Sequence, residues 1–197
     1  MEKEHSMGAG DLLDLIKRRR SVFPPAYNGK EIEREVIEEI LEAGQWAPNH
    51  YRTEPWRFHV IQGEAKKRLG EFIAEHYKGH ALKALFSEAR YNKKLRNPQL
   101  SAAVIAICMK ANGRLKPPYW EEIAAVSCAV QNMWLMCTAR GIGAYWGTPG
   151  VERDAGEFLD LQEGEECLGF FFMGYTDEPW PEGKREGLEG KVVWMDT

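Results

Sequence analysis

The segment from residue 119 to Arg140 constrains the fold most, because apolar residues cover almost the whole circumference of the helix that it predicts. After two prolines, the run "IAAVSCAVQNMWLMCTARG" starts at Ile123 and offers no continuous polar face. A helix that is apolar all round is buried on most sides. Two amides, Gln131 and Asn132, interrupt the run and two glutamates precede it, which argues against a membrane span. We therefore predict a buried helix of about twenty residues.

The chain itself is short for covering such a helix on every side. Its 197 residues suit one domain with a core that needs no disulfide or metal. A second copy of the chain would supply the missing cover. We therefore expect a homodimer whose interface includes this helix.

The other elements predict an α+β layered sandwich with a mostly antiparallel sheet. Period-2 or continuous apolar runs predict strands at 56–61, 101–109, 143–146 and 167–174. Helical spacing predicts helices at 11–20, 31–43 and 152–161, and a longer helix over 64–90 that is interrupted near Gly79. The order is not a strict βαβ repeat, which favours α+β. We expect a flexible leader at 1–10 and one domain over 11–197, ending in an extended arm at about 178–197.

Composition excludes several classes of function. The net charge of −4 gives no basic excess for nucleic acid, so any anionic partner should be small. The four cysteines lie far apart in apolar runs, which indicates buried, reduced thiols and a cytoplasmic protein. The first ten residues hold two glutamates and no apolar core of a signal peptide. We expect no membrane partner.

Motifs for a Rossmann, P-loop or hydrolase site are missing. The glycines at 141, 143 and 147 fail the G-x-G-x-x-G spacing, since Trp146 stands where the third glycine belongs. There is no Walker A or G-x-S-x-G sequence. His76 and His80 are four apart on a predicted helix and could face a metal together, but the sequence suggests no third ligand. We interpret both as surface or capping histidines and predict no metal site.

The segment "KRRRSV", which ends at Val22, suggests a site for a small anion. A solvated helix end explains it as well, because cations suit a helix C-terminus. Yet Arg19, Arg20 and Ser21 combine guanidinium groups with a hydroxyl, which is what a phosphate requires. A second basic pair, Lys184 and Arg185, lies in the arm and could close over the same anion. One phosphomonoester is the ligand that these groups favour.

Four segments in order carry a family resemblance. They are "RRRSV", "WAPNHYRTEPWRFHVI", "ARGIGAYWGTPG" and "GYTDEPWPEGKRE". Together, from about residue 11 to the end, they resemble the nitroreductase family of FMN-dependent oxidoreductases, most closely its small homodimeric members with an A-P-x-H…P-W segment. The resemblance implies a three-layer sandwich with a central, mainly antiparallel sheet flanked by helices. It also implies an FMN site at the dimer interface to which both subunits contribute.

The resemblance implies cofactor-binding roles for residues in each segment. The phosphate, ribityl chain and pyrimidine edge would be held by Arg19, Arg20 and Ser21, with Lys184 and Arg185 completing the phosphate site. Asn49, His50 and Arg52 would offer donors to the cofactor, and Trp146, Gly147 and Thr148 would lie along its ring. Glu54 stands where many relatives carry glutamine. A carboxylate cannot donate a hydrogen bond unless protonated, so Glu54 would pair with Arg52 or Arg20, or accept from a ring or ribityl donor.

The stretch around these loop residues is built for rigidity. Pro48 and Pro55 restrict its backbone, and we expect Trp46 and Trp56 to anchor it into the core. A flat ring with a polar edge needs such a platform. A helix-to-strand loop held by aromatics is the alternative interpretation.

By resemblance, the reaction is a ping-pong hydride transfer. NADPH or NADH would reduce the flavin and leave, and a nitroaromatic, quinone or similar flat acceptor would then take the electrons. No catalytic side chain is demanded; Arg20 is a candidate to stabilise the reduced flavin, and protons would come from water. Alternatives are dehalogenation or oxygen-dependent chemistry in the same family, a flavin-binding module without turnover, and single-stranded nucleic acid bound through "KRRR" with Tyr51 and Arg52.

Three further expectations concern specificity and assembly. Residues 77–98 form a candidate lid that would select the acceptor. A 2′-phosphate of NADPH could meet Lys93, Lys94, Arg96 or Arg140, although a solvated cationic face explains these residues equally well. The segment "KVVWM" at 191–195 could add a strand to the sheet of the other subunit.

Overall fold

The computed structural model describes residues 8–114 and 117–196 and centres on one four-stranded sheet. The strands are β1 (Trp56–Ile61), β2 (Ala103–Lys110), β3 (Ile142–Gly147) and β4 (Glu165–Tyr175), in the order β1-β2-β4-β3. Every neighbouring pair is antiparallel. All four strands lie within two residues of their predicted bounds.

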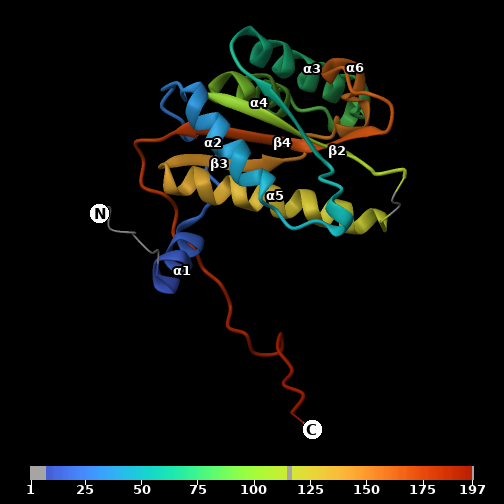
Figure 1. Cartoon of the computed structure of the whole chain (residues 1–197). Helices are drawn as coiled ribbons and strands as arrows, with labels where there is room; N and C mark the ends of the chain where they lie inside the picture. Colours follow the sequence, from blue (N-terminus) through green and yellow to red (C-terminus); the bar gives the residue numbers. More distant parts are fainter. Residues whose placement is uncertain (1–7, 115–116, 197) are drawn as a thin grey trace.

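Helices cover both faces of this sheet, as Figure 1 shows. The α-helices are α1 (Ala9–Arg18), α2 (Arg34–Gln45), α3 (Glu64–His80), α4 (Glu88–Leu100), α5 (Tyr119–Ala139) and α6 (Gly156–Leu159). Short 3-10 turns are η1 (Pro24–Ala26), η2 (His50–Arg52), η3 (Lys83–Leu85) and η4 (Glu152–Asp154). Among the described residues, no helix is both long and apolar enough to cross a membrane.

The alternating side chains of β2 explain why helices pack on both faces of the sheet. Successive side chains of a strand point to opposite faces. Ile105 and Ile107 accordingly join the core cluster with α2 and α5, whereas Val104 and Ala106 join the cluster with α3 and α6. Both clusters are buried, so the α+β three-layer sandwich is confirmed.

The long apolar helix exists but is not covered on every side by its own chain. α5 buries residues such as Ala129, Val130 and Met133 against the sheet and α2. On the opposite side Trp120, Ala124, Cys128 and Gln131 are exposed at helical spacing. A single chain therefore leaves one face of α5 open. The expectation that all four cysteines are buried is wrong for Cys128, and all four are free thiols.

Two predicted helices have different bounds. The helix expected over 64–90 is interrupted near Gly79 as predicted, because α3 ends at His80. The second part, α4, begins only at Glu88, where the hydroxyl of Ser87 caps it by accepting from the Arg90 N–H at 3.4 Å. The helix expected over 152–161 is two short turns, η4 and α6. Most of the candidate lid at 77–98 is therefore helix, packed as α3 against α4.

The first helix begins two residues earlier than predicted. The end of the chain forms an arm without helix or strand. Residues 1–7 of the leader lie outside the described residues, and residues 9 and 10 already belong to α1. Residues 176–196 contain no helix or strand, and Figure 1 shows them passing α1 and running away from the sandwich.

Candidate functional site

Arg19 and Arg20 follow the last turn of α1 and lie against α5. The guanidinium of Arg19 stacks over the ring of Trp134, with its carbon 4.5 Å from the ring centroid. The indole N–H of Trp134 donates to the carbonyl of Arg20 at 3.2 Å. These contacts fix the end of α1 on the open side of α5 and hold both guanidinium groups in place.

The arm brings a third arginine to this position. Arg20 donates from Nε to the carbonyl of Pro181 at 3.0 Å. A Cβ built on Gly183 would lie 1.5 Å from a terminal nitrogen of Arg20, so the arm backbone passes directly over that guanidinium. Burial, and then the charges of Arg185 and Arg20, lower the pKa of Arg19 below its ordinary value. Arg19, Arg20 and Arg185, the basic cluster, thus repel one another.

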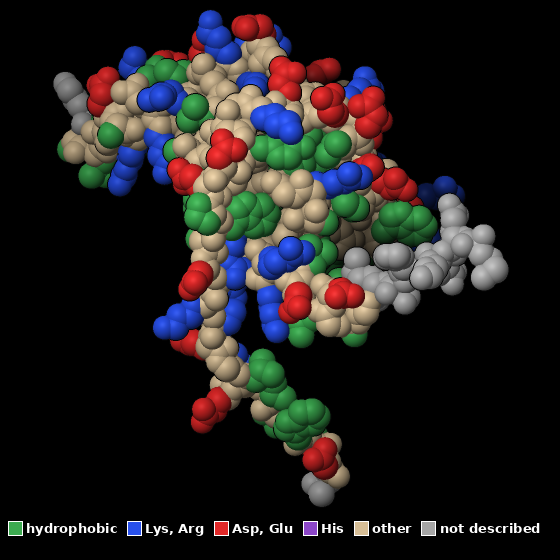
Figure 2. Space-filling view, turned by 90° about the vertical axis from the view of Figure 1, so that its left-hand side faces the viewer, with side chains coloured by type: hydrophobic (Ala, Val, Ile, Leu, Met, Phe, Trp, Pro, Cys, Tyr) green, Lys and Arg blue, Asp and Glu red, His purple; other side chains and the backbone are tan. Residues whose placement is uncertain are grey.

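The basic cluster lines a groove of about 560 Å³ together with Gln131 and Gly183. A second groove of about 710 Å³ lies on the other side of Arg20, where Asp14 and Glu182 also contribute. Within the described ranges, no carboxylate forms an ion pair with a member of the cluster. Figure 2 shows Lys and Arg side chains gathered where the arm leaves the body. Cations that are partly desolvated and lack a counter-ion are suited to an anion.

Ser21 joins the basic cluster to the edge of the sheet. It forms a parallel bridge with Ala144 of β3, and the N–H of Val22 donates to the carbonyl of Ala144 at 3.0 Å. Residues 146–148 then form the end of β3 and the first residue after it. The basic cluster and residues 146–148, which were predicted to lie along the flavin ring, are therefore found at the same edge of the sheet.

Trp146 and its surroundings leave one polar atom without a partner. Its indole nitrogen is buried and has no hydrogen-bond partner in the described part of the chain. Gly169 of β4 has φ of +131°, and a Cβ there would lie 2.6 Å from that nitrogen and 2.8 Å from the carbonyl of Gly147. Glycine at 169 is what allows Trp146 to lie this close to β4.

Residues 49–54, the polar loop, have a strained backbone. Tyr51, Arg52 and Glu54 have positive φ values of 55°, 54° and 44°. Such conformations cost about 1–2 kcal/mol in non-glycine residues. The side-chain oxygen of Asn49 offsets part of this cost by accepting from the N–H of Glu54 at 3.1 Å. Strained loops of this kind are concentrated at functional sites.

His50 connects the polar loop to the start of α5. Its Nδ1 lies 2.5 Å from a carboxylate oxygen of Glu121, and the ring of Tyr51 stacks on it with 3.8 Å between centroids. The pair is partly exposed to solvent. It can share a proton, and no motif in the sequence pointed to Glu121.

One expectation about this loop is wrong, and one alternative for Glu54 is not seen within a single chain. Trp46 is 81% exposed and does not anchor the loop in the core, whereas Trp56 is 4% exposed and donates to Gln45 at 3.3 Å. Trp46 comes directly after the last residue of α2, where its side chain can turn to solvent. Glu54 forms no ion pair with Arg52 or Arg20 within the described ranges, and Arg20 lies beside the other end of α5.

The predicted site residues thus form two groups within one chain. The polar loop lies beside Glu121 and the basic cluster beside Trp134, thirteen residues along α5, which is about 20 Å at 1.5 Å per residue. The structure brings together Arg19, Arg20, Ser21 and Arg185, and it keeps Asn49, His50, Arg52 and Glu54 apart from them. Lys184 and Thr148 are exposed. No single chain gathers all twelve predicted residues around one ligand.

Sequence reasoning missed three groups in the basic site: Trp134, the carbonyl of Pro181 and Gly183. The segment "EPWPEG", directly before Lys184 and Arg185, contains Pro181 and Gly183 and could have pointed to both. Two of the cations considered for a 2′-phosphate already have partners, since Arg140 pairs with Glu39 and Lys94 donates to the carbonyl of Pro149. Lys93 and Arg96 line a separate pocket of about 370 Å³.

Comparisons with known proteins show the family of the chain. A model of the Nitroreductase family matches residues 16–175. YdjA of Escherichia coli (strain K12), provisionally named an NAD(P)H nitroreductase, is 28% identical over 169 residues, which cover 83% of this chain and 87% of YdjA. YfhC of Bacillus subtilis (strain 168), named in the same provisional way, is 27% identical over 189 residues, covering 93% of this chain and 94% of YfhC.

Solved structures show the same architecture. The nitroreductase-like family protein from Bacillus cereus covers the whole of both chains at 25% identity with a TM-score of 0.78. A nitroreductase from Bacteroides fragilis NCTC 9343, solved with bound FMN, is 25% identical with a TM-score of 0.69, covering 94% of this chain and 99% of that one.

Proposed function

Because this chain belongs to the nitroreductase family, we propose that it is an FMN-dependent oxidoreductase that passes electrons from NADPH or NADH to a nitroaromatic, quinone or similar flat acceptor. Two relatives carry NAD(P)H nitroreductase names and one solved relative holds FMN. We further propose a ping-pong order, in which the nicotinamide leaves before the acceptor binds. These names and the bound FMN support the reaction class, and the residues below support its cofactor.

The observation that carries the proposal is the basic cluster. The residues present fit FMN, because three guanidinium groups lie together without a carboxylate partner, Arg19 among them partly desolvated, and a phosphomonoester supplies the opposite charge. Ser21 lies next to them on the edge of β3. Arg19, Arg20, Ser21 and Arg185 would hold the phosphate and ribityl chain, with Lys184 at the rim.

The polar loop would reach the same cofactor from a second copy of the chain. Within one chain the loop and the basic cluster lie at opposite ends of α5, yet α5 has an exposed face along which another copy can dock. A pair of chains related by a twofold axis would bring the loop of one to the cluster of the other. We therefore propose a homodimer with two sites, each built from both chains.

The chain's own groups have defined tasks in this proposal. Bound FMN supplies the hydride-transfer chemistry. The basic cluster binds and orients its anionic end, and the end of β3, with Trp146, Gly147 and Thr148, forms one wall beside it. The strained polar loop presents Asn49, Arg52 and Glu54 in one fixed conformation. Glu121 lies 2.5 Å from Nδ1 of His50 and would orient its ring toward the cofactor.

We also propose that residues 11–197 form one domain in a cytoplasmic protein. The single sheet to which all four strands belong supports the first point, and the four free cysteines support the second.

A test of the phosphate site compares FMN with riboflavin, which lacks the phosphate. Arg185→Gln should weaken FMN binding by about 10–100-fold, the loss of one charged hydrogen bond, and leave riboflavin binding unchanged. Arg68→Gln, at an exposed arginine of α3, is the matched control and should change neither. Equal weakening of both flavins by Arg185→Gln would contradict the assignment.

The reaction itself is tested by the visible spectrum of the FMN-loaded protein without oxygen. Addition of NADPH or NADH should bleach the bound flavin, and a quinone added afterwards should restore its colour. Flavin that stays oxidised with either nicotinamide would instead favour a flavin-binding module without turnover.

A further inference from the structure

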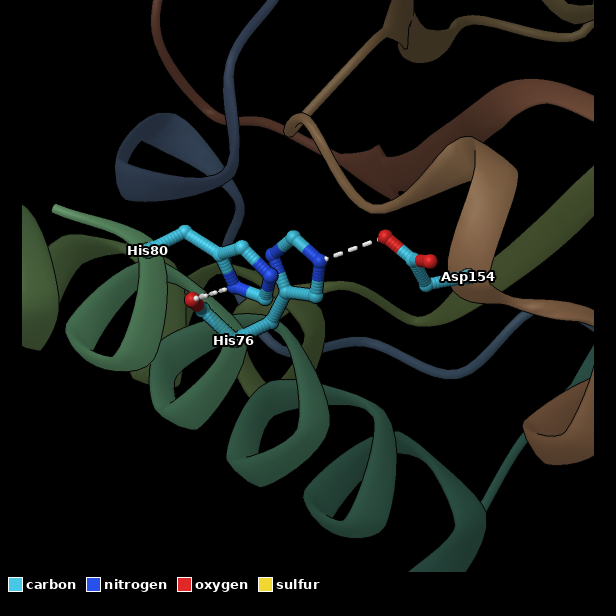
Figure 3. Close-up of side chains that lie close together, drawn as sticks. All are labelled: His76, His80 and Asp154. Atoms are coloured by element: carbon cyan, nitrogen blue, oxygen red, sulfur yellow. Dashed lines mark hydrogen bonds and ion pairs between the residues drawn. The ribbon is translucent and has the colours of Figure 1, made fainter.

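His76, His80 and Asp154 form a second cluster away from the basic cluster and the polar loop. His76 and His80 lie one turn apart in the last turns of α3, and Asp154 ends η4. One ligand atom from each lies within 4.8 Å of the other two. Figure 3 shows the imidazole rings stacked, with Asp154 facing His76 from the other element. The fold therefore supplies the third group that the sequence did not indicate.

The hydrogen bonds of the two histidines orient them for coordination. Nδ1 of His80 lies 2.9 Å from the carbonyl of His76, so it carries the proton and leaves the lone pair on Nε2. A ligating histidine commonly donates its other ring N–H to a backbone carbonyl in this way. Nε2 of His76 lies 2.8 Å from a carboxylate oxygen of Asp154 and donates its N–H to it. A metal bound between these two groups would take the place of that proton, which is released to solvent. The ring centroids are 4.0 Å apart and the ring planes are tilted by 18°, so the two imidazoles are stacked face to face.

We propose that these three residues bind one divalent transition-metal ion of the Zn²⁺ type, which ties the end of α3 to η4. Two imidazoles and a carboxylate suit such an ion, and ligand atoms around tetrahedral zinc lie about 3.3 Å apart. His80 and Asp154 are exposed, so small side-chain rotations can close the longest separation. Three protein ligands leave the remaining coordination positions to water.

The proposed metal would join two segments that are far apart in the chain, residues 81–87 and the loop that leads to η4. After His80 the chain leaves the helix through residues 81–87, and η4 follows four residues after Thr148 at the end of β3. Residues after His80 and the loop before η4 line a pocket of about 380 Å³ that includes His76, His80, Leu85 and Pro149. A bound ion would restrain residues 81–87 and the loop after β3 together. This inference does not depend on flavin binding.

The first test is the stoichiometry of Zn²⁺ binding to full-length, FMN-loaded protein without a histidine tag, measured by calorimetry. We expect one equivalent per chain. His80→Gln and Asp154→Asn, both at exposed positions, should each weaken binding by at least about tenfold. His59→Gln on β1 removes a histidine outside the cluster and should leave binding unchanged.

A second measurement uses Co²⁺ and thermal unfolding. Bound Co²⁺ should give visible absorption bands that are lost in His80→Gln, and saturating Zn²⁺ should raise the midpoint of unfolding of the wild type by several degrees but not that of the variant. Failure to bind one equivalent, or binding that survives both His80→Gln and Asp154→Asn, would overturn the proposal.

Discussion

Tyr27 shows how one buried polar side chain holds the segment before α2 on the sheet. Its hydroxyl donates to the carbonyl of Val22 at 2.7 Å, and the carbonyl of Phe172 lies 3.1 Å away. A Cβ on Gly174 would lie 2.5 Å from the Tyr27 ring, so glycine at 174 makes room for it. Burial raises the pKa of Tyr27 well above its ordinary value. The segment that follows Arg19 and Arg20 is therefore held on the sheet by a phenol that must stay neutral.

Tyr27→Phe should lower the free energy of unfolding at pH 7 by about 1–3 kcal/mol, because a buried carbonyl loses its donor. The unfolded phenol titrates near pH 10 and the folded one higher, so the stabilisation is complete below pH 10 and declines as pH rises further. The difference in the free energy of unfolding between the wild type and Tyr27→Phe should therefore narrow above pH 10. Urea unfolding of both proteins from pH 7 to pH 11 measures this difference. A difference that widens with pH would contradict the prediction.

At the scale of elements, α3 and α4 pack with almost no space between them. Gly70 faces α4, and a Cβ there would lie 2.2 Å from the carbonyl oxygen of Leu95. Gly79, on the same helix, has nothing within 4 Å of a Cβ position. Close packing against α4 therefore requires glycine at position 70, whereas the surroundings of position 79 leave room for a side chain.

Gly70→Ala should destabilise the protein by about 1–3 kcal/mol, since the helices must move apart. Gly79→Ala is the matched control and should stabilise it by about 0.5–1 kcal/mol through helix propensity. Thermal unfolding of both variants provides the comparison. Equal effects would show that the helix crossing tolerates a methyl group.

The open face of α5 provides a second prediction at this scale. Ala124→Glu places a charge on that face and should convert the proposed dimer to monomers, which light scattering would measure. Ala89→Glu, at an exposed alanine of α4, is the control and should leave the mass unchanged.

The same variants report on Cys128 through its reaction with Ellman's reagent. The native wild type should react slowly because the second chain covers this thiol, whereas Ala124→Glu should expose one fast thiol per chain. Fast reaction in the wild type at its dimer mass would place the interface elsewhere.

At the scale of the whole molecule, the arm and α1 would gain most from the proposed second chain. α1 buries none of its residues, and Leu12, Leu13 and Ile16 are exposed. Val193, Trp194 and Met195 near the end of the arm are each more than 80% exposed. β1 pairs only with β2 among the described strands, so its other edge is open to the segment 191–195 of a partner.

Mixed dimers test whether each site uses two chains. A chain with Arg19→Gln and Arg185→Gln and a chain with His50→Ala and Arg52→Ala should each be inactive alone. Random mixing should restore roughly a quarter of wild-type activity, since half of the dimers are mixed and each has one intact site. No recovery in dimers shown to be mixed would mean that one chain builds the whole site.

Deletion of residues from Glu186 onward tests arm exchange while keeping Arg185. We expect a smaller dimer fraction by sedimentation and lower FMN occupancy. Unchanged dimer mass and occupancy would show that the arm does not cross to the partner.

Local patterns in the sequence determined the elements, because helix and strand periods and the apolar run of 101–109 depend on neighbouring residues. They also singled out Arg19, Arg20, Lys184 and Arg185 as two basic pairs that could bind one anion. Only the tertiary structure decided which of these residues meet. The exposure of Trp46, the 20 Å between the polar loop and the basic cluster along α5, and the position of Asp154 beside His76 all depend on contacts between segments far apart in the chain. Such contacts follow from packing against the whole sheet, which no local pattern contains.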